Sequence, residues 1–449
     1  MLEKLNRQNY LKVLLSIALP ISLQVLFQSS LGIIDQIMVG SLGETIISGI
    51  GLGGKIPTVF FFTSGAFTVG ASILMSQFYG RQDRDNVARS FKLFSRWIAV
   101  VGIVFFLGGV LFAEPIMSVY TEDAAVRAVG AVYLRIVAIG FLPSVVTGMV
   151  GSLFRSLGKV KLPTYAAFAG MFLNTFLNWI LIFGKLGFPA MGPAGAAIAT
   201  TATRFLECAI LLAFFFARQK KPETSFDLKL SVGGAFRQNA FRITLPIFLS
   251  ELLWSLGENA YGIIYGHIGT AETAAMVSIG PIIMLTIGFF AGMSQAASVT
   301  TGNRLGAGDP DFALFLGTKT WLIGMFGAIA FGILVIIASP FYPKIFGVED
   351  ATRTTMSAIL VAYALVLWIK VSNMILGGVL KAGGKTKYIF YMDLVGTWAI
   401  GVPLGAVAAF VFDWPIQYVY LAIASEELVR LVIGVILLRS RRWIKMIHA

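Results

Sequence analysis

The 449-residue chain has one cysteine, Cys208, and two histidines, His267 and His448. A single thiol cannot form an internal disulfide framework or a thiolate metal site. The two histidines are far apart in the sequence, so they form no metal-ligand cluster and complete no Ser–His–Asp set. The sequence therefore predicts no enzyme and no cofactor.

Charged residues are also scarce, at 13% of the chain, where soluble domains have roughly a quarter. Hydrophobic residues make up 57%, and the mean hydropathy is +0.83. Many apolar runs are long enough to cross the ~30 Å hydrocarbon core of a bilayer. We therefore expect an all-α membrane protein with lipid as its surroundings.

Hydropathy and loop composition predict twelve transmembrane helices. The first six lie near residues 12–38, 46–76, 93–113, 129–152, 163–184 and 193–217. The second six lie near residues 241–266, 273–302, 315–338, 355–379, 388–411 and 416–438. No cleavable signal is predicted, because MLEKLNRQNYLKVLL leads into a full span without a small-residue cleavage site.

The formal net charge of +13 lies in short loops between apolar runs, which argues against a nucleic-acid partner. Loops on one side carry lysine and arginine, such as Arg81, Arg84 and Lys385. Loops on the other side are acidic, such as Glu122 and Asp123. The positive-inside rule then predicts a plasma (inner) membrane protein with both termini in the cytoplasm.

The second half repeats the first, and four pairs of motifs keep one constant offset. The matching pairs are LPISLQ (19–24) with LPIFLS (245–250), VGSLG (39–43) with YGHIG (265–269), QFYGRQD (77–83) with NRLGAGD (303–309), and GSLFRSLGKVK (151–161) with GGVLKAGGKTK (377–387). We expect two pseudo-symmetric six-helix bundles, residues 1–217 and 239–449, joined by a cytoplasmic loop, 218–238. Parallel repeats of this kind enclose a central cleft in transporters.

Polar side chains within the first-half spans form one candidate site. Asp35 shares a helical face with Gln24 and Gln28. A charge at the bilayer centre costs roughly 2.5–3.5 kcal/mol, so an intramembrane acid is a functional-site hypothesis. Further oxygens come from Asn174, Asn178 and Thr200. Together they predict a cation-coupling site, with Asp35 as a Na⁺ ligand or a protonatable carboxylate; the alternative is hydrogen bonding between helices.

The seventh span carries a second acidic face. Glu251 and Glu258 lie two helical turns apart on one face, with Trp254 and Tyr261 beside them. The aligned positions in the first half are not acidic, which favours an assigned role such as substrate binding over general stabilisation.

Two lysines lie within spans, Lys55 in the second and Lys370 in the tenth. Each either pairs within the protein, as Lys55 with Asp35, or binds an anionic group of a substrate. Because the cleft then holds both signs of charge, a small organic substrate can be cationic or zwitterionic.

Other polar residues look structural. Two charged pairs at equivalent places have helical spacing, Arg204 with Glu207 and Glu426 or Glu427 with Arg430, and are interpreted as locks between helices. A hydroxyl side chain recurs at every fourth position from 64 to 76, a stripe that we interpret as close helix contacts.

These motifs resemble the multidrug and toxic compound extrusion (MATE) family, bacterial type, over nearly the whole chain. The matching segments are LPISLQ…IIDQIMVGSLG, SQFYGRQD, FRSLGKVKLP, NTFLNWILIFGKLGFPAMGPAGAAIAT, LPIFLSELLWSLGENAYGIIYGHIGT and TTGNRLGAGDPDFA. The resemblance implies twelve helices in two lobes and export of organic molecules against Na⁺ or H⁺. It also implies that Asp35 is the coupling carboxylate, with Asn178 standing where the family has an acid.

The expected function is thus a secondary antiporter for multidrug efflux, acting as a monomer by alternating access of the central cleft. The alternative is a lipid-linked sugar or polyisoprenoid flippase of a related superfamily, which Lys55 and Lys370 favour.

Overall fold

The computed structural model describes residues 9–40, 44–120, 123–219, 227, 230–269, 272, 275–276, 278–345 and 350–444. Side chains at 28–37, 39–40, 44–45, 47–48, 219, 266 and 345 lie outside this description. Within the described residues, the only β pairing is a single bridge between Gly384 and Ile444.

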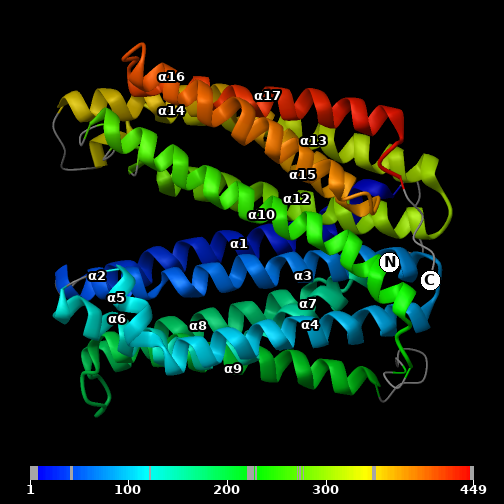
Figure 1. The fold of residues 1–449 in the computed structure, drawn as a ribbon, viewed down its shortest axis with the longest axis horizontal. Coiled ribbons are helices and arrows are strands. Elements are labelled where there is room, and N and C mark those ends of the chain that lie inside the picture. Colours follow the sequence, from blue (N-terminus) through cyan, green and yellow to red (C-terminus); the bar gives the residue numbers. More distant parts are fainter. Residues whose placement is uncertain are drawn as a thin grey trace. The chain divides into compact units, whose positions relative to one another are not determined.

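Helices make up both halves of the chain (Figure 1). The first half contains α1 (Tyr10–Gly40), α2 (Glu44–Gly53), α3 (Lys55–Gly80), α4 (Arg84–Leu111), α5 (Ala113–Tyr120), α6 (Ala124–Ile139), α7 (Phe141–Ser156), α8 (Lys161–Phe183) and α9 (Gly192–Gln219). The second half contains α10 (Gly234–Ile268), α12 (Gly280–Gly306), α13 (Pro310–Ala338), the 3₁₀ helix η2 (Tyr342–Ile345), α14 (Asp350–Ala382), α15 (Lys387–Asp393), the π-helix η3 (Leu394–Gly401), α16 (Val402–Phe410) and α17 (Ile416–Ser440).

Ten helical segments in the described part of the chain are long and apolar enough to cross a membrane, and eleven if a bent pair counts as one. The bent pair is α6 and α7, which meet at 44° where one span, 129–152, is predicted. The predicted span 416–438 coincides with α17, which is long enough but carries Glu426, Glu427 and Arg430 in its middle.

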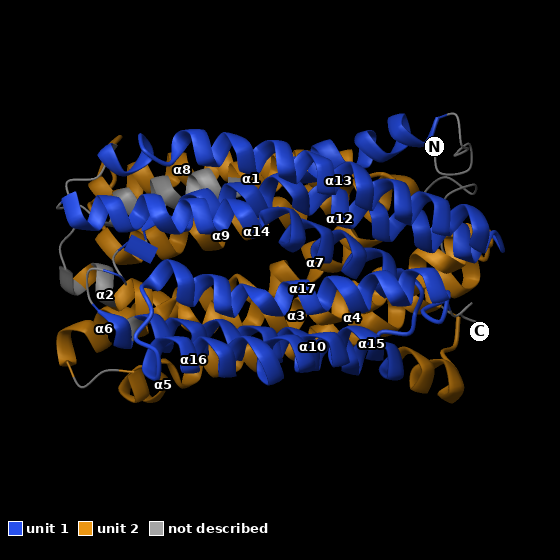
Figure 2. Cartoon of the chain, turned by 90° about the horizontal axis from the view of Figure 1, so that it is seen from above, with its two compact units in different colours: residues 1–22, 241–448 blue, residues 23–240, 449 orange. Residues whose placement is uncertain are grey.

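The helices form two compact units (Figure 2). Unit 1 comprises residues 1–22 and 241–448, and unit 2 comprises residues 23–240 and 449. The first turns of α1 therefore group with the second half, whereas the predicted lobe 1–217 places them with the first. Ser22 illustrates the grouping, because its hydroxyl donates to the Phe289 carbonyl of α12 at 2.6 Å.

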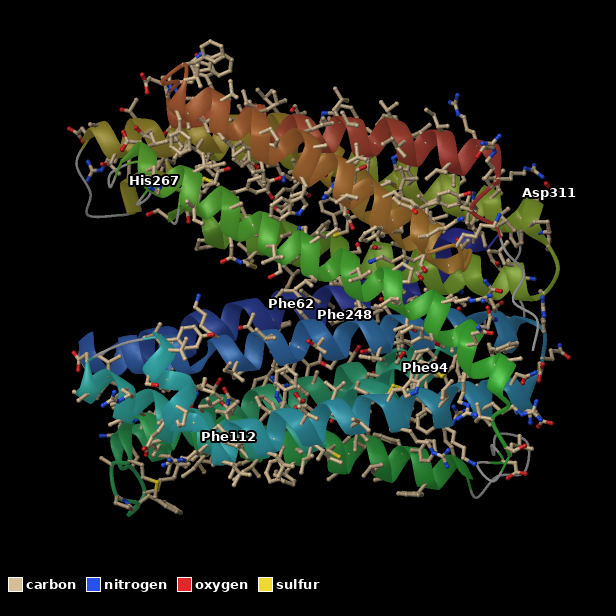
Figure 3. The ribbon with its side chains drawn as sticks, in the orientation of Figure 1. Phe62, Phe94, Phe112, Phe248, His267 and Asp311 are labelled. Atoms are coloured by element: carbon tan, nitrogen blue, oxygen red, sulfur yellow. The ribbon has the colours of Figure 1, made fainter. Side chains whose placement is uncertain are left out.

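Each unit buries apolar side chains inside and exposes others outside. On α4, Phe94 is fully buried, whereas Phe112, which directly follows the helix, is 57% exposed (Figure 3). Large apolar side chains on an outer surface suit contact with lipid, where only a helix satisfies all its backbone groups internally.

The repeat extends to helix capping. Asp83 caps α4 and accepts a hydrogen bond from the Asn86 backbone N–H at 3.0 Å. Asp309, at the equivalent position of the second half, caps α13 and accepts from the Phe312 N–H at 2.9 Å. The carboxylates satisfy backbone donors that have no partner in the first turn of a helix.

Replacing either capping aspartate with alanine is expected to lower the free energy of unfolding by about 1 kcal/mol, because the cap is lost. Asp83→Asn and Asp309→Asn should retain most of this stability, since an asparagine side chain also caps a helix N-terminus. Reversible unfolding of the purified protein in mixed micelles measures the change. Asp85→Ala, at an exposed first-turn position, is the matched control; an equal loss in that variant would contradict the capping role.

Candidate functional site

The predicted first-half site lies in unit 2 and is described in part. The Asn178 side chain is 2% exposed, and its Nδ2 donates to Asn174 Oδ1 at 3.3 Å. Thr200 Oγ1 donates to the Ala196 carbonyl of its own helix at 3.0 Å. These residues come from α8 and α9, which pack against each other.

The side chain of Asp35, the acid of this predicted site, lies outside the described residues, and so does the side chain of Gln28. The expected pair between Lys55 and Asp35 is therefore outside the description too. Lys55 itself is exposed at the first position of α3.

Unit 1 contains a connected set of buried charges centred on Arg430, which is 8% exposed on α17. Its Nη2 lies 3.2 Å from Asp393 Oδ1 and 3.9 Å from Glu426 Oε2. The same nitrogen donates to Thr397 Oγ1 at 2.5 Å. Asp393 also accepts a hydrogen bond from the Ser250 hydroxyl of α10. One cation thus neutralises a carboxylate of its own helix and one from α15.

Lys370 on α14 belongs to the same region. Its Nζ lies 3.2 Å from Glu427 Oε1, and it sits 6.0 Å from the centre of the Tyr420 ring. The Asn373 amide, one turn along α14, donates to Glu427 Oε2 and to the Glu427 carbonyl, both at 2.7 Å. Lys370 therefore has a carboxylate partner within the protein, Glu427.

The residues of the second acidic face on α10 differ in their contacts. Glu251 Oε1 lies 3.3 Å from Lys381 Nζ, and the buried Tyr261 hydroxyl donates to Glu426 Oε2 at 2.7 Å. Glu258 and Trp254 on the same helix are exposed. The face therefore contacts charged partners at two positions and is accessible at two others.

A π-helix borders this charged set. The segment η3 follows Asp393 directly and carries Thr397. A Cβ on Gly396 would lie 2.6 Å from Arg430 Nε, so this position admits the guanidinium only without a side chain. π-Helical turns occur frequently at functional sites.

Both predicted ion pairs are present, but each lies within one helix and does not lock two helices together: Arg204 Nη1 is 3.1 Å from Glu207 Oε2 on α9, and Glu426 contacts Arg430 on α17. The hydroxyl side chains of the predicted stripe fall into two kinds of surroundings. Ser72 contacts Ser156 across helices at 3.2 Å, as expected of a helix contact, whereas Ser64 lines a cavity.

Sequence reasoning missed several members of the unit 1 set, among them Asp393 and Asn373. Asp393 lies in the predicted span 388–411, so it carried the same signal as Asp35, an acid inside an apolar run. No sequence pattern identified its partner, because Arg430 is distant in the chain.

Arg430→Met is expected to lower the free energy of unfolding by about 3 kcal/mol, since removing one partner leaves buried carboxylates without their cation. The double variant Arg430→Met/Asp393→Asn should recover part of the loss. Unfolding in mixed micelles measures both. Arg439→Met, exposed near the end of the same helix, should change stability little, and a double variant less stable than Arg430→Met would contradict the arrangement.

Comparison with known proteins now identifies the family. The sequence model of the MatE family matches residues 20–180 and 246–407, one match in each half. The chain is 27% identical over 419 residues to the "Probable multidrug resistance protein NorM" of Pasteurella multocida (strain Pm70), covering 88% of this chain and 85% of the relative. It is 24% identical to the "Uncharacterized transporter YisQ" of Bacillus subtilis (strain 168), covering 96% and 95%.

Solved structures share the fold. One described as "Outward-facing conformation of a multidrug resistance MATE family transporter of the MOP superfamily" superposes with a TM-score of 0.87 at 18% identity, covering 96% of this chain and 95% of that chain. Another, "Crystal structure of MATE in complex with MaL6", has the same TM-score and covers 96% of both chains. The predicted all-α membrane fold class is confirmed. The family match covers well over half of the sequence, and the chain therefore belongs to the MATE family of membrane transporters.

Proposed function

We propose that this cation-coupled multidrug efflux transporter of the MATE family exports small amphipathic organic compounds, cationic or zwitterionic, in exchange for Na⁺ or H⁺. The observation that carries the proposal is the duplication: each half has its own family match and its own ionisable side chains within membrane-spanning helices. Rocking of the two halves, 1–217 and 239–449 with the 218–238 linker, would open the cleft to alternate sides.

Coupling is assigned to the first half. A Na⁺ ion or a proton held by Asp35 can drive transport only if it binds one state of the transporter more tightly than the other. Asn178 is buried and hydrogen-bonded to Asn174, so these amides and Thr200 supply a preorganised neutral surrounding. With asparagine at position 178, Asp35 is the sole carboxylate of this set.

Substrate binding is assigned to the second acidic face. The exposed Glu258 and Trp254 offer a carboxylate and an aromatic ring to an organic cation. Glu251, Tyr261 and Lys370 are held by partners within unit 1, so they position this face. Gln28, as a further substrate-binding residue, stays a prediction from the sequence. We place the protein in the inner membrane as a monomer with both termini in the cytoplasm.

Asp35→Asn is expected to abolish gradient-driven efflux while leaving expression and folding intact, because the side chain can no longer bind a proton or supply a full negative charge. Purified protein in liposomes, with Na⁺ and H⁺ gradients imposed separately, measures the loss and identifies the ion. Asp85→Asn removes an exposed carboxylate at the start of α4 and serves as control. Full efflux by Asp35→Asn would reject the coupling role.

The orientation is testable because Cys208 is the only native cysteine. In a Cys208→Ser background, Ala190→Cys should react with an impermeant maleimide in right-side-out vesicles, since residue 190 follows the fifth predicted span. Ala307→Cys, after the eighth predicted span, should react only once the vesicles are opened. Both alanines are exposed. The reverse pattern would place the termini outside the cytoplasm.

A further inference from the structure

Unit 2 contains a cavity of about 340 Å³ whose walls come from α3, α4, α7 and α9. Phe60, Phe61, Val69 and Ile98 provide its apolar lining. The volume is at the lower end of the ~300–1,000 Å³ typical of small-molecule sites. It therefore suits a ligand with one or two rings.

Three of the four hydroxyl groups on the cavity wall donate to carbonyls of their own helices, and the fourth, on Thr147, does not. Ser64 donates to the Phe61 carbonyl at 3.2 Å, Thr68 to the Ser64 carbonyl at 2.6 Å, and Ser144 to the Gly140 carbonyl at 2.7 Å. The strongest hydrogen-bond donors that the wall offers to a ligand are consequently its guanidinium groups.

Three ionisable side chains line the cavity: Arg155, Arg204 and Glu207. Arg204 is paired with Glu207, and its guanidinium carbon lies 5.3 Å from the centre of the Phe61 ring. Arg155 forms no ion pair with any carboxylate among the side chains that the structure describes. The described lining thus has two positive charges and one negative charge.

Arg155 reaches the cavity from the last turn of α7. A Cβ on Gly151, one turn earlier, would lie 3.3 Å from Arg155 Nη1. The arginine side chain therefore folds back over the preceding turn, which is the direction that helical side chains favour. This path brings the guanidinium to the cavity wall.

The repeat provides an internal comparison for these two arginines. Their counterparts at the aligned positions of the second half are Lys381 and Arg430, which are also basic. In unit 1, each counterpart is neutralised by an acid from another helix: Lys381 by Glu251 at 3.3 Å, and Arg430 by Asp393 at 3.2 Å.

The first half lacks the acids that perform this neutralisation. Glu251 aligns with Val25 in the first half, and Asp393 aligns with Ala167. The basic residues of the repeat are thus retained in unit 2 without the carboxylates that bind them in unit 1. An anion from outside the protein would complete the unit 2 arrangement.

We propose that this cavity binds the carboxylate of a small amphipathic organic zwitterion. The acid group lies against the guanidiniums of Arg155 and Arg204, which match a carboxylate with paired donors. The ring system of the ligand lies against Phe60 and Phe61. The inference rests on the proposed function, since it specifies one chemical class of exported compound.

The test compares three probes that share one ring system: 2-naphthoate, 2-naphthalenemethanol and 2-naphthylmethylammonium. Calorimetric titration of the purified full-length protein, without an ion gradient, measures the affinity for each. We expect 2-naphthoate to bind about 10-fold more tightly than the alcohol, since a charge-assisted hydrogen bond is worth roughly that factor or more. Equal affinity for 2-naphthoate and 2-naphthalenemethanol would overturn the proposal, as would a preference for the ammonium that persists in Glu258→Gln, which lacks the carboxylate proposed to bind cations.

Two variants locate the site. Arg155→Gln should lower the affinity for 2-naphthoate about 10-fold while leaving the affinity for the alcohol unchanged. Lys161→Gln, at an exposed position on α8, is the charge-matched control. A Cβ at Gly65 meets nothing within 4 Å, so Gly65→Leu should fill the cavity without displacing the backbone. The Gly65→Leu variant should lower the affinity for 2-naphthoate at least as much as Arg155→Gln does, although it retains Arg155.

If Arg155→Gln fails to fold, the Gly65→Leu variant and the comparison of the three probes still test whether the cavity binds a carboxylate. Unchanged 2-naphthoate affinity in Gly65→Leu would overturn the proposal, as would unchanged affinity in folded Arg155→Gln. Because binding is measured without a gradient, a failure of the coupling role of Asp35 would leave the binding result intact. Conversely, absence of a carboxylate preference would leave coupled efflux unaffected.

Discussion

The hydrocarbon interior of a bilayer contains no water, so a charge placed there needs a partner within the protein or in an aqueous cavity. Unit 1 meets this requirement internally. Arg430 binds Asp393, and Lys370 binds Glu427, so that charges from α14, α15 and α17 cancel in pairs. These contacts join helices that are far apart in the sequence, and they bring the π-helix η3 against the Arg430 side chain.

Duplication copied the helical scaffold, its capping aspartates and two basic positions, but not the acids that neutralise those bases in unit 1. The capping residues Asp83 and Asp309 occupy equivalent positions and make equivalent hydrogen bonds. By contrast, the basic residues shared by both halves meet several acids in unit 1 and one acid, Glu207, on the cavity wall of unit 2. The shared basic residues are thereby neutralised in unit 1, whereas the described cavity wall of unit 2 keeps a surplus positive charge, which suits different tasks in a transport cycle.

Sequence patterns predicted the helices, the repeat and the ion pairs of short spacing. Arg204 with Glu207 was predictable because side chains at i and i+3 on a helix face the same side. Asp393 was visible as an acid in an apolar run, but its partner was not, since the pairing depends on how α15 and α17 pack. Arg155 lies between the predicted spans 129–152 and 163–184, whereas the structure places it in α7 and turns its side chain back toward the cavity.

The sequence by itself determined the membrane class, the twelve predicted spans, the two-fold repeat and the resemblance to one transporter family, because all of these follow from the order and periodicity of apolar and charged residues. Only the tertiary structure decided which charges neutralise one another, where the cavity lies, and that the first turns of α1 group with the second half. The physical reason is that helix formation is local, whereas ion pairing and cavity shape depend on side chains brought together from distant helices.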